Sequence, residues 1–365
     1  REMAIRNVPF LLTRVLVSSY IAITAFADDL YFPPAEGNWQ AVAPKELGWD
    51  EKALEAALQY AGECQSTGVV ILHNGRMVAE KYWDSTSASP RLKRMIPEVL
   101  DGNRTREDVA SVQKSVTSFL CGVAVTKGLL SIDKPVSVYL GEGWSKATAE
   151  QEGAVTVRHL MTMTSGLSAE LEYQVPPGSR WRYNTNAYAK TTKVLEAAVD
   201  KDMNALTAEW LTGPTGMRES KWEPRTRLEA AVEANSIGFV TSARDLARFG
   251  LLILAGAKWN DTDLLSNPAY LKESLSPSQK LNPAYGLLWW LNGQSSYVEA
   301  AGGERVEGTM NPAAPADLVQ AAGALGRKCY IVPSLGLVVT RLGDQPGDPG
   351  FDEKFWERLM KVVKP

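Results

Sequence analysis

A serine and a lysine three residues apart form the strongest candidate for chemistry in the sequence. Ser111 and Lys114 lie in the segment DVASVQKSV, which begins at Asp108, and apolar residues recur around them at helical spacing. Both side chains would therefore project from one side of a helix. A serine hydroxyl needs a base within hydrogen-bond reach, and a lysine supplies one when burial lowers its pKa enough to populate the neutral amine. The pair predicts nucleophilic catalysis.

The Ser-x-x-Lys spacing alone has low specificity. The same spelling occurs at Ser131 and Lys134, where the neighbouring Gly128 and Pro135 mark a turn. An ordinary polar first turn of a helix explains Ser111 and Lys114 equally well. The start of such a helix also offers unpaired backbone N–H groups to a developing oxyanion. The motifs that follow along the chain decide between these interpretations.

Five further motifs follow the pair in a characteristic order. They are VTVRHLMTMTSGL (155–167), PPGSRWRYNTNAY (176–188), TSARDLARFG (241–250), YGLLWW (285–290) and AAGALG (321–326). With them the chain resembles the serine β-lactamase and penicillin-binding-protein-like superfamily over roughly residues 45–363. Within it, the chain is similar to the class C-like serine hydrolases, which include family VIII carboxylesterases and nylon-oligomer hydrolases.

The resemblance implies a role for individual residues. Ser111 matches the nucleophile, Lys114 its base partner, and Tyr183 the tyrosine that carries a proton to the leaving group. A phenol suits this role when a neighbouring lysine stabilises its anion, because its ordinary pKa is near 10. Gly323 matches a position of close backbone approach. The N–H groups of Ser111 and Ala324 are expected to hold the oxyanion.

The chain departs from the family pattern at two positions. Thr185 stands where the family commonly has a substrate-binding asparagine, with Asn184 and Asn186 on either side. The stretch Ala321-Ala322-Gly323 replaces the Lys-Thr-Gly or His-Thr-Gly of β-lactamases and D-Ala-D-Ala peptidases. Because that basic residue normally helps to bind a substrate carboxylate, its absence argues against penicillins and stem peptides. Arg327 either substitutes for it or points to solvent.

Other candidate residues have competing interpretations. Tyr188, Tyr285, Trp289 and Trp290 line an acyl pocket or belong to the core. The two histidines, His73 and His159, are expected to be structural. Since no Gly-x-Ser-x-Gly elbow accompanies them, the sequence argues against a hydrolase with a Ser-His-Asp triad.

Composition excludes several classes of protein. The chain has 365 residues, 45% of them hydrophobic, and a net charge of −3, which provides no basic surface for nucleic acid. Its 3 cysteines are widely spaced and form no CxxC, so we expect buried thiols and no disulfide framework. No cofactor or metal is expected, and the expected partner is a small-molecule ester, amide or lactam.

The N-terminal residues have the pattern of a secretory leader. Arg1, Arg6 and Arg14 precede an apolar run over residues 15–26, and a small-x-small site ends at Ala27. The run is too short for a confident membrane span. We therefore predict a signal peptide over residues 1–27 and a periplasmic or secreted protein, without a membrane span after signal removal.

The elements that position these residues alternate between strands and helices. Asp50 is expected to cap a helix, and Asn74-Gly75 joins strands over 67–73 and 76–83 in a hairpin. Helices are predicted over 108–127, capped by Asp108, and over 156–164, 186–200, 203–211 and 242–255, the last opened by a capping box from Ser242 to Asp245. The rest of the chain is predicted to contain a strand over 285–291 and a long loop over 292–317. Strands over 316–322, 328–332 and 337–342 follow, and then a helix from Asp352.

This arrangement predicts an α+β fold of the β-lactamase/transpeptidase-like type, an antiparallel sheet flanked by helices with an inserted helical domain. The sheet domain is expected over 28–105 and 280–365, and the helical domain over 106–279, with the active site at their interface. We expect an exported serine hydrolase acting on a small ester or amide. A β-lactamase or D-Ala-D-Ala carboxypeptidase is an alternative, as is a non-catalytic binding protein, which Thr185 and Ala321 permit.

Overall fold

A six-stranded antiparallel sheet forms the centre of the molecule. A computed structural model describes residues 30–226 and 235–363, so the predicted leader lies outside the described residues. The strand order is β2-β1-β14-β13-β12-β9. The strands are β1 (Ser66–His73), β2 (Arg76–Tyr82), β9 (Trp290–Leu291), β12 (Val319–Gly323), β13 (Arg327–Val332) and β14 (Leu337–Gly343). The predicted antiparallel sheet is therefore confirmed, and it takes strands from both ends of the described chain.

Alternate residues of the central strands supply two hydrophobic cores. Along β1, Val69 and Ile71 pack into one core, whereas Val70 and Leu72 pack into the other. This alternation is what a strand covered on both faces requires. At the end of β1, Asn74 and Gly75 both adopt positive φ, 47° and 81°, and close the predicted hairpin.

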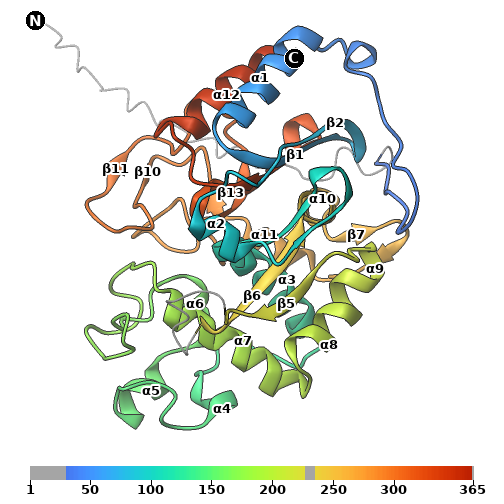
Figure 1. Ribbon diagram of the computed structural model, residues 1–365. Helices are drawn as coiled ribbons and strands as arrows, with labels where there is room; N and C mark the ends of the chain where they lie inside the picture. Colours follow the sequence, from blue (N-terminus) through green and yellow to red (C-terminus); the bar gives the residue numbers. More distant parts are fainter. Residues whose placement is uncertain (1–29, 227–234, 364–365) are drawn as a thin grey trace, which may run out of the picture.

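Two terminal helices cover one face of the sheet. Helices α1 (Glu51–Glu63) and α12 (Phe351–Val362) lie side by side, as Figure 1 shows. Asp50 caps α1 as predicted, because its carboxylate accepts hydrogen bonds from the N–H groups of Lys52 and Ala53 at 2.9 and 3.0 Å. The opposite face is covered by α10 (Ala243–Leu254), which contacts β13 and β14.

The middle of the chain is helical, with a second sheet that the sequence did not predict. Its longest helices are α3 (Gln113–Thr126) and α7 (Thr185–Val199), which pack against each other, and the short helices α6 (Val157–Met161) and α8 (Met203–Thr207) both contact α7. The second sheet has the order β3-β4-β6-β5, with β3 (Glu98–Val99), β4 (Thr105–Asp108), β5 (Lys221–Pro224) and β6 (Ile237–Ser242). The predicted domain boundaries stay a prediction.

Shorter elements complete the described part of the chain. They are α2 (Pro90–Met95), α4 (Ser137–Leu140), α5 (Ala149–Ala154), α9 (Gly213–Thr215), α11 (Pro268–Ser274), β7 (Lys258–Trp259), β8 (Thr262–Asp263), β10 (Ser296–Tyr297) and β11 (Val306–Glu307). Over the ranges 30–226 and 235–363, no helix combines the length and apolar character that crossing a bilayer requires.

Three predicted local features are wrong. Asp108 does not cap a helix: it ends β4, accepts a hydrogen bond from the Ala110 N–H at 2.9 Å and pairs with Arg225, while α3 begins only at Gln113. The strand over 285–291 shrinks to Trp290–Leu291, because Leu288 adopts a φ of 65° that a strand does not allow. The loop over 292–317 contains the short β10–β11 pair.

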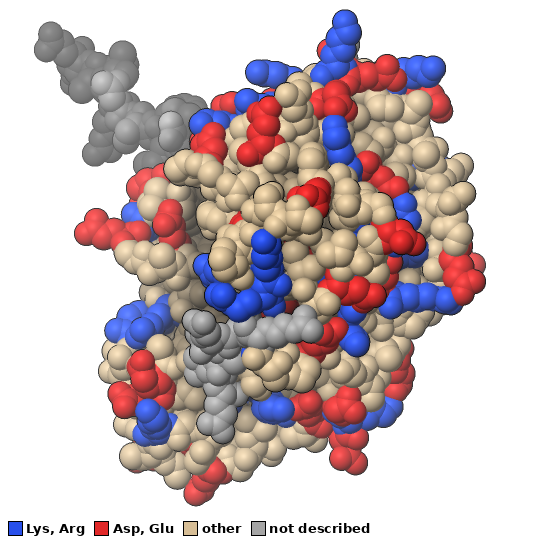
Figure 2. All heavy atoms as spheres, viewed as in Figure 1, with Lys and Arg blue, Asp and Glu red and all other residues tan. Residues whose placement is uncertain are grey.

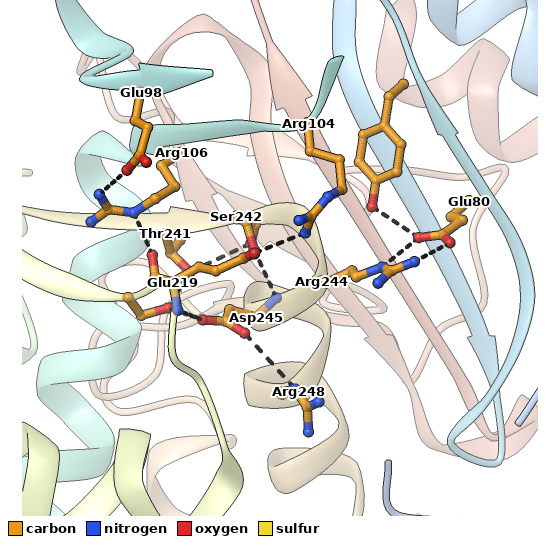
Figure 3. A network of polar contacts seen from close by, with 12 residues as sticks. Glu80, Glu98, Arg104, Arg106, Glu219, Thr241, Ser242, Arg244, Asp245 and Arg248 are labelled. Atoms are coloured by element: carbon orange, nitrogen blue, oxygen red, sulfur yellow. Dashed lines mark hydrogen bonds and ion pairs between the residues drawn. The ribbon is translucent and has the colours of Figure 1, made fainter. Parts of the chain in front are cut away.

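The capping box of α10 is only half formed. Ser242 accepts a hydrogen bond from the Asp245 N–H at 3.3 Å, as the sequence predicts. The Asp245 carboxylate, however, accepts from the Glu219 N–H at 2.7 Å and from the Ser220 hydroxyl at 2.8 Å. Figure 3 shows the resulting network, in which the Asp245 carboxylate connects the start of α10 to the segment that precedes β5.

Candidate active site

Ser111 lies in a tight turn between β4 and α3. The turn is a 3-10 helix over Ala110–Val112, and Ala110 has a φ of 50°, which is uncommon for a residue with a side chain. Val109 and Val112 anchor it, since both are fully buried. The Val109 N–H also donates to the Phe239 carbonyl of β6 at 3.0 Å. The second sheet thus fixes the backbone that presents Ser111, whose side chain is half-buried.

Lys114 lies beside Ser111, as the i, i+3 spacing predicts. Its Nζ is 2.9 Å from the Ser111 Oγ and 3.3 Å from the Thr185 Oγ1. The ammonium position faces the rings of Tyr183 and Tyr188, with 4.8 and 4.6 Å to their centroids. Burial, together with the positive charge of Arg225, lowers the pKa of Lys114 to about 7. A substantial fraction of the amine is therefore neutral near pH 7 and able to accept a proton.

Tyr183 is the second side chain, after Lys114, that contacts the Ser111 hydroxyl. Burial raises the pKa of the Tyr183 phenol, while its hydrogen bond with the Ser111 side chain acts in the opposite direction. We expected the neighbouring lysine to stabilise a phenolate. Lys114 instead lies over the ring face, and the phenol stays protonated at neutral pH.

An aromatic group holds the Tyr183 ring in place. Tyr183 stacks on Trp290 with 5.9 Å between centroids and an interplanar angle of 22°, and its ring contacts Tyr285 edge-on. Trp181, which was not predicted from the sequence, contacts all three rings. The other two predicted aromatic residues lie outside this group: Trp289 stacks on Phe249 in the core, whereas Tyr188 lies at the site, where its ring faces Lys114.

Thr185 occupies the position at which the family commonly has a substrate-binding asparagine. Thr185 contacts the Lys114 amine, as given above, and begins α7. Asn184 caps this helix and donates to the Leu167 and Ser168 carbonyls, and Asn186 donates to the Ala169 carbonyl. Both neighbouring amides thus bind backbone, and neither replaces the family's asparagine beside the serine.

The end of β12 lies against the serine turn. Gly323 is so close to it that a Cβ on this residue would be 2.3 Å from the Val109 carbonyl oxygen. Ala324 follows at the exposed start of a turn, and Ala321 is fully buried. The predicted residues Ser111, Lys114, Tyr183, Thr185 and Gly323 are therefore brought together, with Ala324 next in the chain.

Arg327 does not replace the missing basic residue. Its side chain is fully buried and forms an ion pair with Glu107, with 3.0 Å between Arg327 Nη2 and Glu107 Oε2. The alternative in which it points to solvent is wrong as well.

A buried arginine near Lys114 was missed by the sequence reasoning. Arg225 donates to both oxygens of Asp108 at 2.7 and 3.0 Å and to Gln113 Oε1 at 2.7 Å. It is the charge that acts on the lysine pKa. No local signal could have found it, because its side-chain partners Asp108 and Gln113 lie more than a hundred residues earlier in the chain.

The histidines and cysteines have structural positions. His73 packs edge-on against Trp49, and the His159 Nδ1 accepts a hydrogen bond from the Thr156 N–H at the start of α6. The three cysteines are free and buried. On the face seen in Figure 2, acidic and basic side chains are interspersed, without a large area of one sign.

The Beta-lactamase family model matches residues 52–363. An uncharacterized protein of Alkalihalophilus pseudofirmus is 23% identical over 330 residues, which cover 82% of this chain and 92% of that protein.

Solved structures share the fold. A Bacillus anthracis protein suggested to be a 6-aminohexanoate-dimer hydrolase has a TM-score of 0.64 at 16% identity, covering 92% of this chain and 91% of that one. EstCE1, a hydrolase with promiscuous acyltransferase activity, has a TM-score of 0.60 at 16% identity, covering 87% and 99%. A β-lactamase of Mycobacterium bovis has a TM-score of 0.58 at 17% identity, covering 84% and 100%.

Proposed function

Because this chain belongs to the beta-lactamase family, we propose that it is a serine hydrolase that forms an acyl-enzyme at Ser111 on a small ester or amide. The contact of 2.9 Å between the Lys114 amine and the Ser111 hydroxyl supports this proposal most directly. Among the carboxylates of residues 30–226 and 235–363, none forms an ion pair with the buried Lys114, and a buried lysine of this kind costs stability. Its position beside a half-buried serine is accounted for by proton transfer.

In the proposed reaction, the neutral Lys114 amine accepts the Ser111 proton while Oγ attacks the substrate carbonyl carbon. The N–H groups of Ser111 and Ala324 donate hydrogen bonds to the resulting oxyanion. The Tyr183 phenol gives its proton to the leaving oxygen or nitrogen as that bond to carbon breaks, and the Lys114 ammonium restores the phenol. A water molecule then gives a proton to the neutral Lys114 amine and attacks the acyl carbon. The bond between this carbon and Ser111 Oγ breaks, Oγ takes the proton back from Lys114, and the acid is released.

The residues around the site favour an uncharged substrate over a β-lactam. Ala321, Ala322 and Gly323 offer no cation to a substrate carboxylate. Arg327 and Arg225 are both buried and paired with carboxylates. The rings around Tyr183 form an apolar wall beside the nucleophile.

Release of p-nitrophenol from short-chain esters tests the proposal. Ser111→Ala and Lys114→Ala should lose the activity of the wild type. Ser131→Ala and Lys134→Ala are the matched controls, because they alter the second Ser-x-x-Lys copy and should retain it. Equal activity in all five proteins contradicts the proposal. Faster turnover of a chromogenic cephalosporin than of esters would favour a β-lactam as the substrate. Ligand binding without any hydrolysis would favour the non-catalytic binding protein.

The proposal includes export, which is supported by the leader pattern of residues 1–27. The native protein is expected in the periplasmic or secreted fraction with Asp28 as its first residue. N-terminal sequencing measures this, and a mature chain that still begins upstream of Asp28 argues against it.

A further inference from the structure

Three consecutive carbonyl groups follow the proposed second oxyanion donor, and buried arginines bind all three. The Ala324 carbonyl accepts a hydrogen bond from Arg327 Nη1 at 3.0 Å. The Leu325 and Gly326 carbonyls accept from Arg341 Nη1, each at 2.9 Å. In this turn Leu325 and Gly326 have φ of 62° and 71°. A left-handed conformation is uncommon for a residue with a side chain such as Leu325, whereas Gly326 adopts it readily.

Arg327 also connects this turn to the strand that leads to Ser111. Its Nε and Nη2 lie 3.1 and 3.0 Å from Glu107 Oε2, and both side chains are fully buried. Glu107 belongs to β4, which ends just before the serine turn. Its other oxygen accepts hydrogen bonds from the hydroxyls of Thr105 and Thr67. One guanidinium therefore bridges the two parts of the proposed oxyanion hole.

Arg341 holds the far side of the same turn. It lies on β14, is fully buried, and donates to the Ser66 hydroxyl at 2.9 Å and to the Cys64 and Asp344 carbonyls at 2.8 and 2.9 Å. A guanidinium presents its five N–H groups in a rigid plane, which a lysine cannot reproduce.

We propose that Arg327 and Arg341 are positioning residues for the oxyanion hole, fixing the Ala324 N–H relative to Ser111. This inference rests on the proposed function, because it assumes that the Ala324 N–H binds the oxyanion. A donor stabilises a transition state most when its position is set before the reaction, and neither arginine needs to touch the substrate for this. The Glu107–Arg327 pair fixes the distance between the two segments, and Arg341 fixes the shape of the turn.

Arg327→Lys and Arg341→Lys test the proposal, because each keeps the positive charge and loses part of the hydrogen-bond network. Arg248→Lys is the matched control. Arg248 is also buried and donates to backbone carbonyls, those of Pro33 and Thr215 at 2.9 and 3.0 Å and that of Pro34. The measurements are kcat and KM for a p-nitrophenyl ester, the inhibition constant of phenylboronic acid, whose tetrahedral serine adduct needs the same N–H groups, and the melting temperature.

For Arg327→Lys and Arg341→Lys we expect kcat/KM to fall about 10- to 100-fold, mainly through kcat, and the inhibition constant to rise by a similar factor. Arg248→Lys should lower the melting temperature but keep both constants within about twofold of the wild type. Glu107→Gln, which keeps the size of the side chain, provides a third variant if one of the lysine variants does not fold.

Two outcomes distinguish this inference from the function on which it rests. If the wild type shows Ser111-dependent turnover and the folded Arg327 and Arg341 variants match Arg248→Lys in both constants, the positioning role is wrong and the hydrolase proposal stands. If the wild type shows no Ser111-dependent turnover, the proposed function fails, and the positioning role fails with it.

Discussion

Gly323 and Val109 touch backbone to backbone at the centre of the proposed site. A Cβ at residue 323 would lie 2.3 Å from the Val109 carbonyl oxygen and 3.2 Å from the Val112 nitrogen. The Val112 side chain lies at the same contact, because its Cγ2 would also be 3.2 Å from that Cβ. This main-chain contact limits how closely β12 and the serine turn can approach each other, and the Glu107–Arg327 ion pair holds the two segments together.

Gly323→Ala should therefore abolish most of the activity. The new methyl group would force β12 away from the serine turn, and we expect kcat/KM for a p-nitrophenyl ester to fall about 100-fold or more. Gly153→Ala is the control, because Gly153 lies in α5 and a Cβ added there would have no atom within 4 Å, so the activity should be unchanged. A Gly323→Ala variant with wild-type kcat/KM would contradict this close contact.

The activity should depend on the ionisation of Lys114. Because the pKa of Lys114 lies at about 7, kcat/KM should rise with pH through about 7 as the amine loses its proton. Arg225→Met should move this limb to higher pH, since it removes a positive charge and leaves Asp108 unpaired. Arg225→Lys, which keeps the charge, should leave the limb in place. A limb that does not move in Arg225→Met would show that burial alone, without the charge of Arg225, lowers the pKa of Lys114.

The same lysine should lower the stability of the protein. In the unfolded chain its pKa returns to about 10.5, so between about pH 7 and 10.5 the unfolded chain binds more protons and stability rises with pH. Lys114→Met should raise the free energy of unfolding at pH 7 by about 2 kcal/mol or more, with a smaller gain near pH 10. Urea unfolding at both pH values measures this. Lys134→Met, at an exposed position, should show no such gain.

Tyr183→Phe should reveal the role of the phenol in proton transfer. The variant keeps the ring stack on Trp290 and loses the hydroxyl that contacts Ser111. We expect kcat to fall about 100-fold for alkyl esters, which need a protonated leaving group, and less for p-nitrophenyl esters. Tyr270→Phe, which removes a buried hydroxyl bonded to the Ser118 carbonyl, should not discriminate between the two leaving groups. If kcat in Tyr183→Phe falls equally for alkyl and p-nitrophenyl esters, the phenol does not protonate the leaving group.

The sequence predicts the parts of the site that are close along the chain. Ser111 and Lys114 are neighbours on successive turns, and the hairpin at Asn74-Gly75 depends on two adjacent residues, so local spacing suffices for both. The central strands β1 and β14 are largely apolar and could be recognised from their pattern. The packing of Gly323 on Val109 depends on contacts between distant segments.

The second sheet could not be recognised, because its key strand has no apolar pattern. Strand β4 consists of Thr105, Arg106, Glu107 and Asp108. Three of its side chains pair with partners far away in the chain, Arg106 with Glu223, Glu107 with Arg327 and Asp108 with Arg225. Hydrophobic periodicity cannot find a strand that is buried through ion pairs. For the same reason Arg225 and Glu107 were absent from the predicted site.

The pairing of Ser66 with Gly343 in the central sheet has a consequence for the order of assembly. During synthesis, β1 and the Ser111 turn leave the ribosome long before β12, β13 and β14, which complete the sheet and bring Gly323 and the two arginines. A nascent chain therefore has Ser111 and Lys114 but still lacks Ala324, the second donor of the proposed oxyanion hole. The non-local pairing also slows folding. The proposed hydrolase would remain inactive until nearly its whole chain has been made.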